Sequence, residues 1–152
     1  MGSTKKIREL LLNAIFEVFE KMFYIFLEPV DKNVKYDMVA SIDVNGSIKG
    51  QINAFFSQGM AESMVKNMLG IQAGPVTDKL IEDCTKEAVN MISGNFLHKY
   101  NAAKAFDLFI PFFEKKSGIF VRQEEASSEN VWNLFFESDK SLLGIKMSII
   151  KS

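Results

Sequence analysis

The sequence predicts an α+β domain in which long helices cover one face of a mostly antiparallel sheet of about six strands. Two long stretches, residues 4–27 and 78–100, carry apolar side chains at helical spacing. Several short segments alternate apolar with polar residues and are separated by turn residues, as in hairpins. The length of 152 residues is typical of one domain, which we place at 1–152.

The first helix is expected from Thr4 to Leu27, where Pro29 would end it. One stripe of apolar residues runs along the whole segment. A second apolar flank adds Leu12, Phe16, Phe19, Phe23 and Leu27. A helix this apolar is buried on more than one side, either under other elements of its own chain or in a dimer interface.

Two strands are expected at Tyr36–Val44 and Ser47–Phe56. Asn45-Gly46 between them predicts a two-residue type I′ turn, which requires positive φ at both positions. In the second strand, isoleucine, alanine and phenylalanine alternate with polar side chains, so one face is buried. A short helix over 58–69 follows, and Gly70 is placed to end it.

After a linker at residues 71–76, Thr77 is suited to cap a helix that runs from about Asp78 to Tyr100. Further strands are expected at Phe106–Phe113, Ile119–Gln123, Val131–Glu137 and Leu142–Ile150. Pro111 indicates an edge or a bulge in the first of them. Residues 124–129 are a polar loop, and residues 138–140 form the turn of a final hairpin.

The composition excludes several classes of function. A net charge of −1 with dispersed lysines and arginines argues against nucleic-acid binding. No apolar run approaches the ~18 residues that a membrane span needs, so a cytoplasmic location is expected. The single cysteine, Cys84, excludes an internal disulfide. The single histidine, His98, lies fourteen residues later, ~21 Å along the same helix, so the two side chains cannot meet within a subunit. We therefore expect no metal site and no cofactor in this chain.

The most informative segment is the helix over 78–100, which carries Glu87 and Asn90 three residues apart. Residues at i and i+3 leave the same face of a helix. Asp83 and Gly94 share this face, which lies opposite the apolar stripe that is centred on Ile81 and includes Met91. An exposed glycine inside a helix costs ~1 kcal/mol relative to alanine, which is tolerable where another molecule approaches closely. Asn95 falls inside the apolar arc and is expected to satisfy backbone groups in the core.

E-x-x-N followed by Gly-Asn, within the segment EAVNMISGN, resembles the signature of the CheX/CheC/FliY chemotaxis phosphatases. The Gly-rich hairpin SIKGQINAFFS, the following AESMVKNMLG and the later FDLFIPFFEKKSG agree with that family in order and spacing. The resemblance covers about residues 5 to 150, and the single good motif makes it most similar to the CheX branch.

The resemblance implies a phosphatase that hydrolyses the aspartyl phosphate of a CheY-like response regulator. Asn90 would orient the attacking water, and Glu87 would pair with the partner's active-site lysine. Asp83 and Gly94 would belong to the partner-binding surface; the alternative for Asp83 is that it only solvates the helix. The Mg²⁺ of the reaction would be held by the partner. The family also implies a homodimer and two pseudo-repeated halves.

The first helix matches the second only loosely. Glu17 would correspond to Glu87, but Glu20 stands where Asn90 stands, so the first half lacks the amide. We therefore predict one active centre.

Three alternatives stay open. Glu87 and Asn90 could be ordinary solvated residues of a helix surface. The chain could be a non-catalytic module that docks on a response regulator or in a flagellar or signalling assembly. It could also bind a small ligand in a Met- and Phe-rich interior, in which case a closed pocket lined by Met64 and Met68 is expected.

Overall fold

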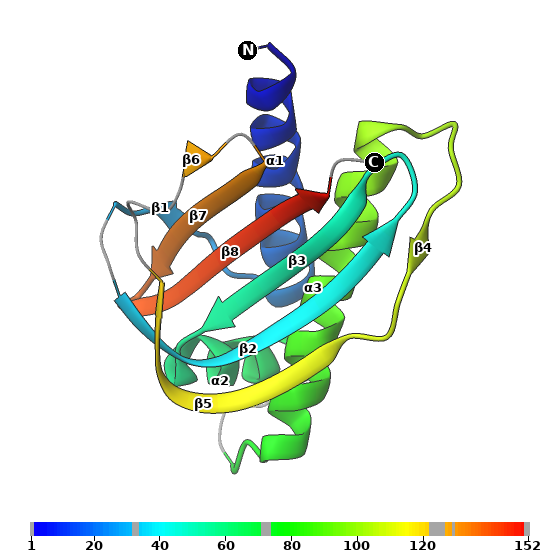
Figure 1. Cartoon of the computed structure of the whole chain (residues 1–152). Helices are drawn as coiled ribbons and strands as arrows, with labels where there is room; N and C mark the ends of the chain where they lie inside the picture. The colour runs from blue at the N-terminus through cyan, green and yellow to red at the C-terminus, as the bar shows by residue number, and fades with distance from the viewer. Residues whose placement is uncertain (1, 32–33, 71–73, 122–126, 129, 151–152) are drawn as a thin grey trace.

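A computed structural model describes residues 2–31, 34–70, 74–121, 127–128 and 130–150. Three helices lie on one side of a single sheet, and the other side of the sheet faces the viewer in Figure 1. The helices are α1 (Gly2–Phe23), α2 (Gln58–Leu69) and α3 (Asp78–Tyr100). The two-layer α+β architecture expected from the sequence is confirmed.

The sheet has five long strands and three of two residues each. These are β1 (Glu28–Pro29), β2 (Val34–Asn45), β3 (Lys49–Phe56), β4 (Asp107–Leu108), β5 (Phe112–Val121), β6 (Ser127–Ser128), β7 (Val131–Ser138) and β8 (Ser141–Ile150). Their order is β1-β7-β8-β3-β2-β4, with β5 paired to β2 and β6 paired to β7, all antiparallel. The hairpins β2–β3 and β7–β8 follow α1 and α3 and join along β3 and β8, which fits two repeated halves.

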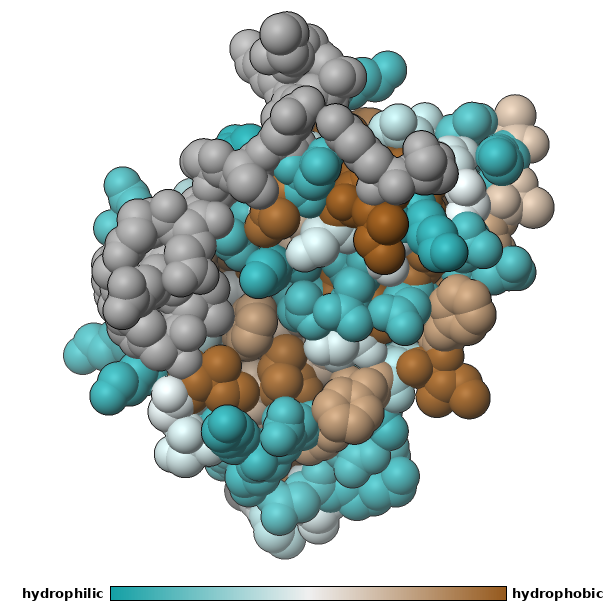
Figure 2. Space-filling model, in the orientation of Figure 1, coloured by the Kyte–Doolittle hydropathy of each residue, from teal (hydrophilic) through white to brown (hydrophobic). Residues whose placement is uncertain are grey.

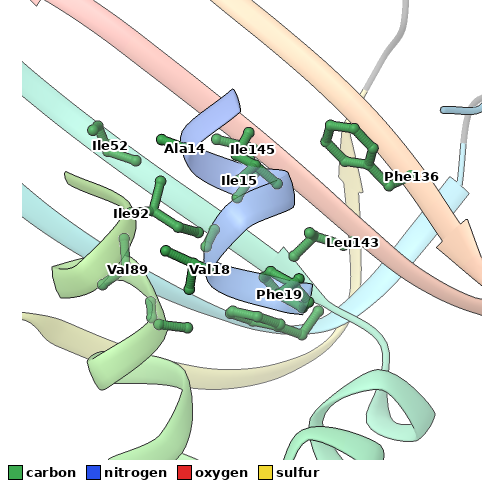
Figure 3. Close-up of a cluster of buried hydrophobic side chains, with 14 of the residues drawn as sticks. Ala14, Ile15, Val18, Phe19, Ile52, Val89, Ile92, Phe136, Leu143 and Ile145 are labelled. Carbon is green, nitrogen blue, oxygen red and sulfur yellow. The ribbon is translucent and has the colours of Figure 1, made fainter. Parts of the chain in front are cut away.

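The core lies between the helices and the inner face of the sheet. Cross-strand neighbours place apolar side chains in rows, such as Met38, Phe56, Leu143 and Phe136. Figure 3 shows Ile15, Val18 and Phe19 of α1 and Val89 and Ile92 of α3 packed over this face. Most of the second apolar flank of α1 is buried in this core or packed against it. Phe16, for example, makes an edge-to-face contact with Phe136, with 5.5 Å between the ring centroids.

The predicted end of α2 at Gly70 and the predicted start of α3 at Thr77 are both confirmed. Ser57 accepts a hydrogen bond from the Met60 amide at the start of α2, and Gly70 ends it in the left-handed region with φ of 68°. The Thr77 hydroxyl accepts from the Leu80 amide at 3.2 Å and begins α3.

The end of the first helix differs from the expectation. α1 ends at Phe23 and not at Leu27, because Tyr24 adopts φ of 55° and the Ile25 amide donates to the Phe19 carbonyl at 3.0 Å. A left-handed residue reverses the chain, so the helix has ended before Pro29.

The first hairpin turn was also predicted wrongly. Asn45 pairs with Lys49, which leaves a loop of residues 46–48, and neither Asn45 nor Gly46 has positive φ. Gly46 is required for packing, because a Cβ there would lie 2.7 Å from that of Phe106. The turn with two left-handed residues is at Asp139 and Lys140, in the predicted final hairpin.

The segment after α3 forms fewer separate strands than expected. Only residues 107–108 of the predicted strand at 106–113 pair as β4, and Phe112 to Val121 then form one strand, β5, across the expected gap. A register shift opposite Tyr36 and Met38 absorbs the extra residues of β5. The predicted linker at 71–76 and loop at 124–129 lie partly outside the described residues.

The outer face of the sheet carries a small second cluster around Tyr36 and Phe135, both buried. Figure 2 shows hydrophilic side chains across the middle of this face, with hydrophobic ones between and around them. The Tyr36 hydroxyl has no hydrogen-bond partner among the described residues. It also excludes a side chain at Gly144, where a Cβ would lie 2.8 Å from the Tyr36 oxygen. Burial raises the pKa of the Tyr36 phenol.

We expect Tyr36→Phe to leave stability unchanged or to raise it by up to ~1 kcal/mol, because it removes a buried hydroxyl without a partner. Urea unfolding of the variant and the wild type measures the difference. Tyr24→Phe is the matched control, since Tyr24 is 68% exposed and should show no effect. A clear loss of stability in Tyr36→Phe would show that the hydroxyl has a stabilising partner.

Candidate functional site

The candidate site is built on α3, which packs one face on the sheet and on α1 and turns the other outward. Its buried residues are Ile81, Cys84, Thr85, Ala88, Val89, Ile92, Ser93, Phe96 and Leu97. The hydroxyls of Thr85 and Ser93 donate to carbonyls one turn earlier, at Ile81 and Val89, so these buried polar groups are satisfied within the helix. The packing of this face fixes which residues of α3 can reach another molecule.

Glu87 and Asn90 project from the outer side of α3. Glu87 is exposed, as predicted, and Asn90 is half-buried rather than fully exposed. Glu87 differs from the other carboxylates of the helix. Asp78 pairs with Lys115, Glu82 with Lys86 and Asp83 with Lys79, at 2.7 to 3.0 Å. In the part of the chain that the structure describes, the side chains of Glu87 and Asn90 make no hydrogen bond or ion pair and are available to a partner.

The two remaining predicted site residues also lie on this outer side. Asp83 is exposed, and its ion pair with Lys79 raises the pKa of that lysine. Gly94 is half-buried, and a Cβ at this position would lie 3.7 Å from Cδ1 of Leu108 in β4. The close neighbour of Gly94 within the chain is therefore β4, at ordinary van der Waals distance.

A groove of about 500 Å³ opens beside Asn90, between α1, α3 and the segment that contains β4. It is lined by Glu17, Asn90, Met91, Gly94, Asn95, His98, Lys99, Phe106 and Leu108. Sequence reasoning missed this groove, because Glu17 and Leu108 approach α3 only in the folded chain. The one signal available was Gly94, which marked a close approach on this side of the helix.

Two expectations about α3 are corrected by the groove. Met91, expected in the apolar stripe, is 44% exposed at the rim. Asn95, expected to satisfy backbone groups in the core, is half-buried and lines the groove. Its Oδ1 is shielded from solvent and accepts no hydrogen bond from the described residues. Both residues lie where α3 faces the groove, so neither is covered by the sheet.

Glu17 on α1 accepts hydrogen bonds from Lys99 of α3 at 2.9 Å and Lys21 at 3.2 Å. These bonds lower the pKa of Glu17 from its ordinary value of 4.5 to about 2. Lys99 thus joins the two long helices at the groove. Glu17, the carboxylate of the first half that would correspond to Glu87, is therefore already paired with lysines of its own chain.

The other candidate residues are placed as expected. Cys84 is buried, and burial, with a smaller effect from the charge of Glu87, raises the pKa of its thiol to about 12. His98 is exposed at the groove, on the same helix. Met64 is fully buried in the core, and neither this groove nor a second hollow between α2 and the β7–β8 turn is lined by Met64 or Met68. Nothing in the described helices reaches the length and apolarity that crossing a membrane requires.

Comparison with known proteins places the chain in a known family. The model of the family described as chemotaxis phosphatase CheX matches residues 38–137, which include the whole of α3. No curated protein matches the chain in sequence.

Solved structures share the fold over nearly the whole chain. The chemotaxis protein CheX from Vibrio vulnificus has a TM-score of 0.76 at 22% identity, with 95% of this chain and 96% of that chain covered. CheX in a CheX-CheY-BeF3-Mg²⁺ complex from Borrelia burgdorferi has a TM-score of 0.68 at 19% identity, with 94% and 97% covered. FliY from Thermotoga maritima is more distant, with a TM-score of 0.56 at 11% identity and 94% and 86% covered.

We expect Glu17→Gln to destabilise the fold modestly at pH 7, by up to ~1 kcal/mol, because the ion pairs are partly exposed. The folded pKa lies below the ordinary value, so ionised Glu17 stabilises the fold above pH 4.5. That contribution is lost as the pH falls from 4.5 through about 2. The difference from wild type in urea unfolding should therefore shrink over this range, whereas exposed Glu20→Gln should show no such difference. An effect of Glu17→Gln that is constant with pH would contradict the ion-pair explanation.

Proposed function

The chain belongs to the CheX chemotaxis phosphatase family, and on that basis we propose that it hydrolyses the aspartyl phosphate of a CheY-like response regulator. The observation that carries the proposal is the unpartnered pair Glu87 and Asn90 on the outer face of α3. A cytoplasmic location, where such regulators act, is part of the same proposal.

Asn90 supplies the group that positions water. An acyl phosphate already has a good leaving group, so hydrolysis mainly requires a water held in line with the phosphorus. A carboxamide both donates to and accepts from that water and keeps its charge near pH 7. The receiver domain supplies the Mg²⁺ that neutralises charge on the phosphoryl oxygens. This division explains how α3 can act through the amide of Asn90 without supplying a nucleophile.

Glu87 fixes the position of α3 against the receiver by pairing with a lysine beside the phosphorylated aspartate. Such a role requires a carboxylate without a partner inside its own fold. Of the four carboxylates on α3, only Glu87 meets that requirement among the described residues, because Asp78, Glu82 and Asp83 are paired with lysines. The solved complex of a CheX with CheY supports a partner of this class.

A non-catalytic adaptor is the second candidate function. The same free pair would serve a protein that binds the phosphorylated receiver without hydrolysing it. The two functions differ in what Asn90 does, because an adaptor needs no water-positioning amide.

We also propose that the chain forms a homodimer. The flank of α1 that first suggested one is largely covered by the chain's own core. A different apolar surface is open, on the connection between β4 and β5, where Phe109 is 51%, Ile110 91% and Phe112 63% exposed. Figure 2 shows hydrophobic side chains gathered at the lower right, where this connection runs. Exposed apolar side chains at a sheet edge favour pairing with another chain.

The phosphatase is tested by the dephosphorylation rate of a phosphorylated CheY-like receiver from the same genome. Wild type should accelerate the reaction, and Asn90→Ala should lower kcat by about 100-fold or more while binding is retained, as for loss of a positioning group. Glu87→Ala should lower both the affinity for the receiver and the rate, because the ion pair with the receiver's lysine is lost together with the alignment of α3 that depends on it. Asp83→Ala, on the same face but paired with Lys79, should change the rate only slightly.

Unchanged phosphate release in Asn90→Ala would exclude the mechanism. Binding by wild type without acceleration over the spontaneous rate would identify an adaptor. If several receivers of the genome neither bind nor are dephosphorylated, the proposed partner class is wrong.

The dimer is tested by light scattering during size-exclusion chromatography of wild type and Ile110→Lys. We expect wild type to elute as a dimer and the variant to shift toward the monomer, because a charge is placed in an apolar contact. Leu69→Lys, an exposed apolar residue on α2, is the control and should stay dimeric. A wild type that remains monomeric at high micromolar concentration would rule the dimer out.

A further inference from the structure

We propose that the groove between α1, α3 and β4 receives an apolar or aromatic side chain from the surface of the receiver, and that this contact sets affinity rather than the rate of hydrolysis. The inference rests on the proposed function, because it deepens the description of the same partner. The side chain would come from the receiver surface next to its phosphorylated aspartate.

The position of the groove puts it inside any interface centred on the candidate site. Asn90 itself lines the groove, and Met91 and Gly94 follow within one turn, ~6 Å along the helix. A specific protein–protein interface covers ~800 Å² on each partner, which is a disc of about 16 Å radius. A receiver that brings its acyl phosphate to Asn90 must therefore cover the groove as well.

The chemistry of the lining selects the occupant. Met91, Phe106 and Leu108 present apolar surface, and the absent side chain of Gly94 leaves the helix backbone accessible. The charged groups at the other end, Glu17 and Lys99, are paired with each other at 2.9 Å. Glu17 and Lys99 therefore offer a charged side chain no free counter-ion. Asn90, Asn95 and His98 complete the lining, and beside them the apolar surface would favour the desolvation of an apolar or aromatic side chain.

Met91 has a suitable character for such a contact. It is 44% exposed, whereas Met60 and Met64 are fully buried in the core. Its unbranched, polarisable side chain can adapt to a partner ring or aliphatic group. Affinity contributed by Met91, Phe106 and Leu108 is uniform in the ground state and the transition state, because in the proposed function Asn90, and not these side chains, holds the attacking water.

The experiment uses one reactive thiol placed at the rim. The native Cys84 is buried with its pKa raised to about 12, so Met91→Cys offers the accessible thiol for alkylation with N-ethylmaleimide. Met68→Cys is the matched control, since Met68 is a methionine of similar exposure, 37%, on α2 and does not line the groove. Each variant is compared with itself before and after alkylation, so a difference cannot arise from failure to fold.

We expect alkylation of Met91→Cys to raise KM for the phosphorylated receiver about 10-fold or more with kcat unchanged, and alkylation of Met68→Cys to change neither. Gly94→Leu, which fills the groove from within, should reproduce the rise in KM. A fall in kcat at constant KM, or no change in either, would overturn the proposal. A change of oligomeric state in step with KM would assign the groove to a second copy and would also overturn it.

Failure of the phosphatase function remains distinguishable from failure of this proposal. Binding to the receiver with beryllium fluoride at its aspartate is measured for the same proteins without turnover. Weaker binding only in alkylated Met91→Cys supports the groove contact even if wild type hydrolyses nothing. Equal binding by alkylated and unmodified protein overturns it even if the enzyme is active.

Discussion

The packing of α3 on the sheet is the constraint on which the rest of the site depends. Val89 and Ile92 lie against the inner face together with Ile52 of β3, while Ala88 and Phe96 complete the buried side of the helix. With 3.6 residues per turn, burial of these positions fixes the direction of every other side chain on α3. Glu87 and Asn90 therefore face outward without any support from loops, on a rigid element that a partner can approach as a preformed surface.

The electrostatic arrangement divides the carboxylates of the helices into structural and available ones. Lysines form ion pairs with Asp78, Glu82 and Asp83 on α3, and two lysines form ion pairs with Glu17 on α1. Each of these pairs is partly exposed and contributes little to stability on its own. These pairs leave Glu87 as the free negative charge of α3 among the described residues. In the proposed function, a basic side chain of the receiver would thereby be directed to one position on the helix.

Much of the framework could be predicted from local sequence, and the exceptions have tertiary causes. Thr77 and Gly70 determine helix ends through their own backbone and side-chain geometry, so α2 and α3 were located correctly. The first hairpin was predicted correctly, but its turn was predicted wrongly because Gly46 serves the close approach of Phe106 and not a left-handed turn. The two outward residues of α3 could be recognised from helical periodicity and family resemblance. The groove could not, since its walls come from residues far apart in the sequence, such as Glu17 and Leu108, which are 91 positions apart.

The contrast between Glu17 and Glu87 has an evolutionary consequence. In a fold made of two similar halves, one ancestral carboxylate can remain exposed for contact while its counterpart is recruited to hold the two helices together. Selection then acts on the two positions for different reasons. Residue 17 can change wherever another link between α1 and α3 compensates, whereas in the proposed function residue 87 would change only together with the lysine of its partner. Among lineages of this protein, residue 17 should therefore vary more than residue 87.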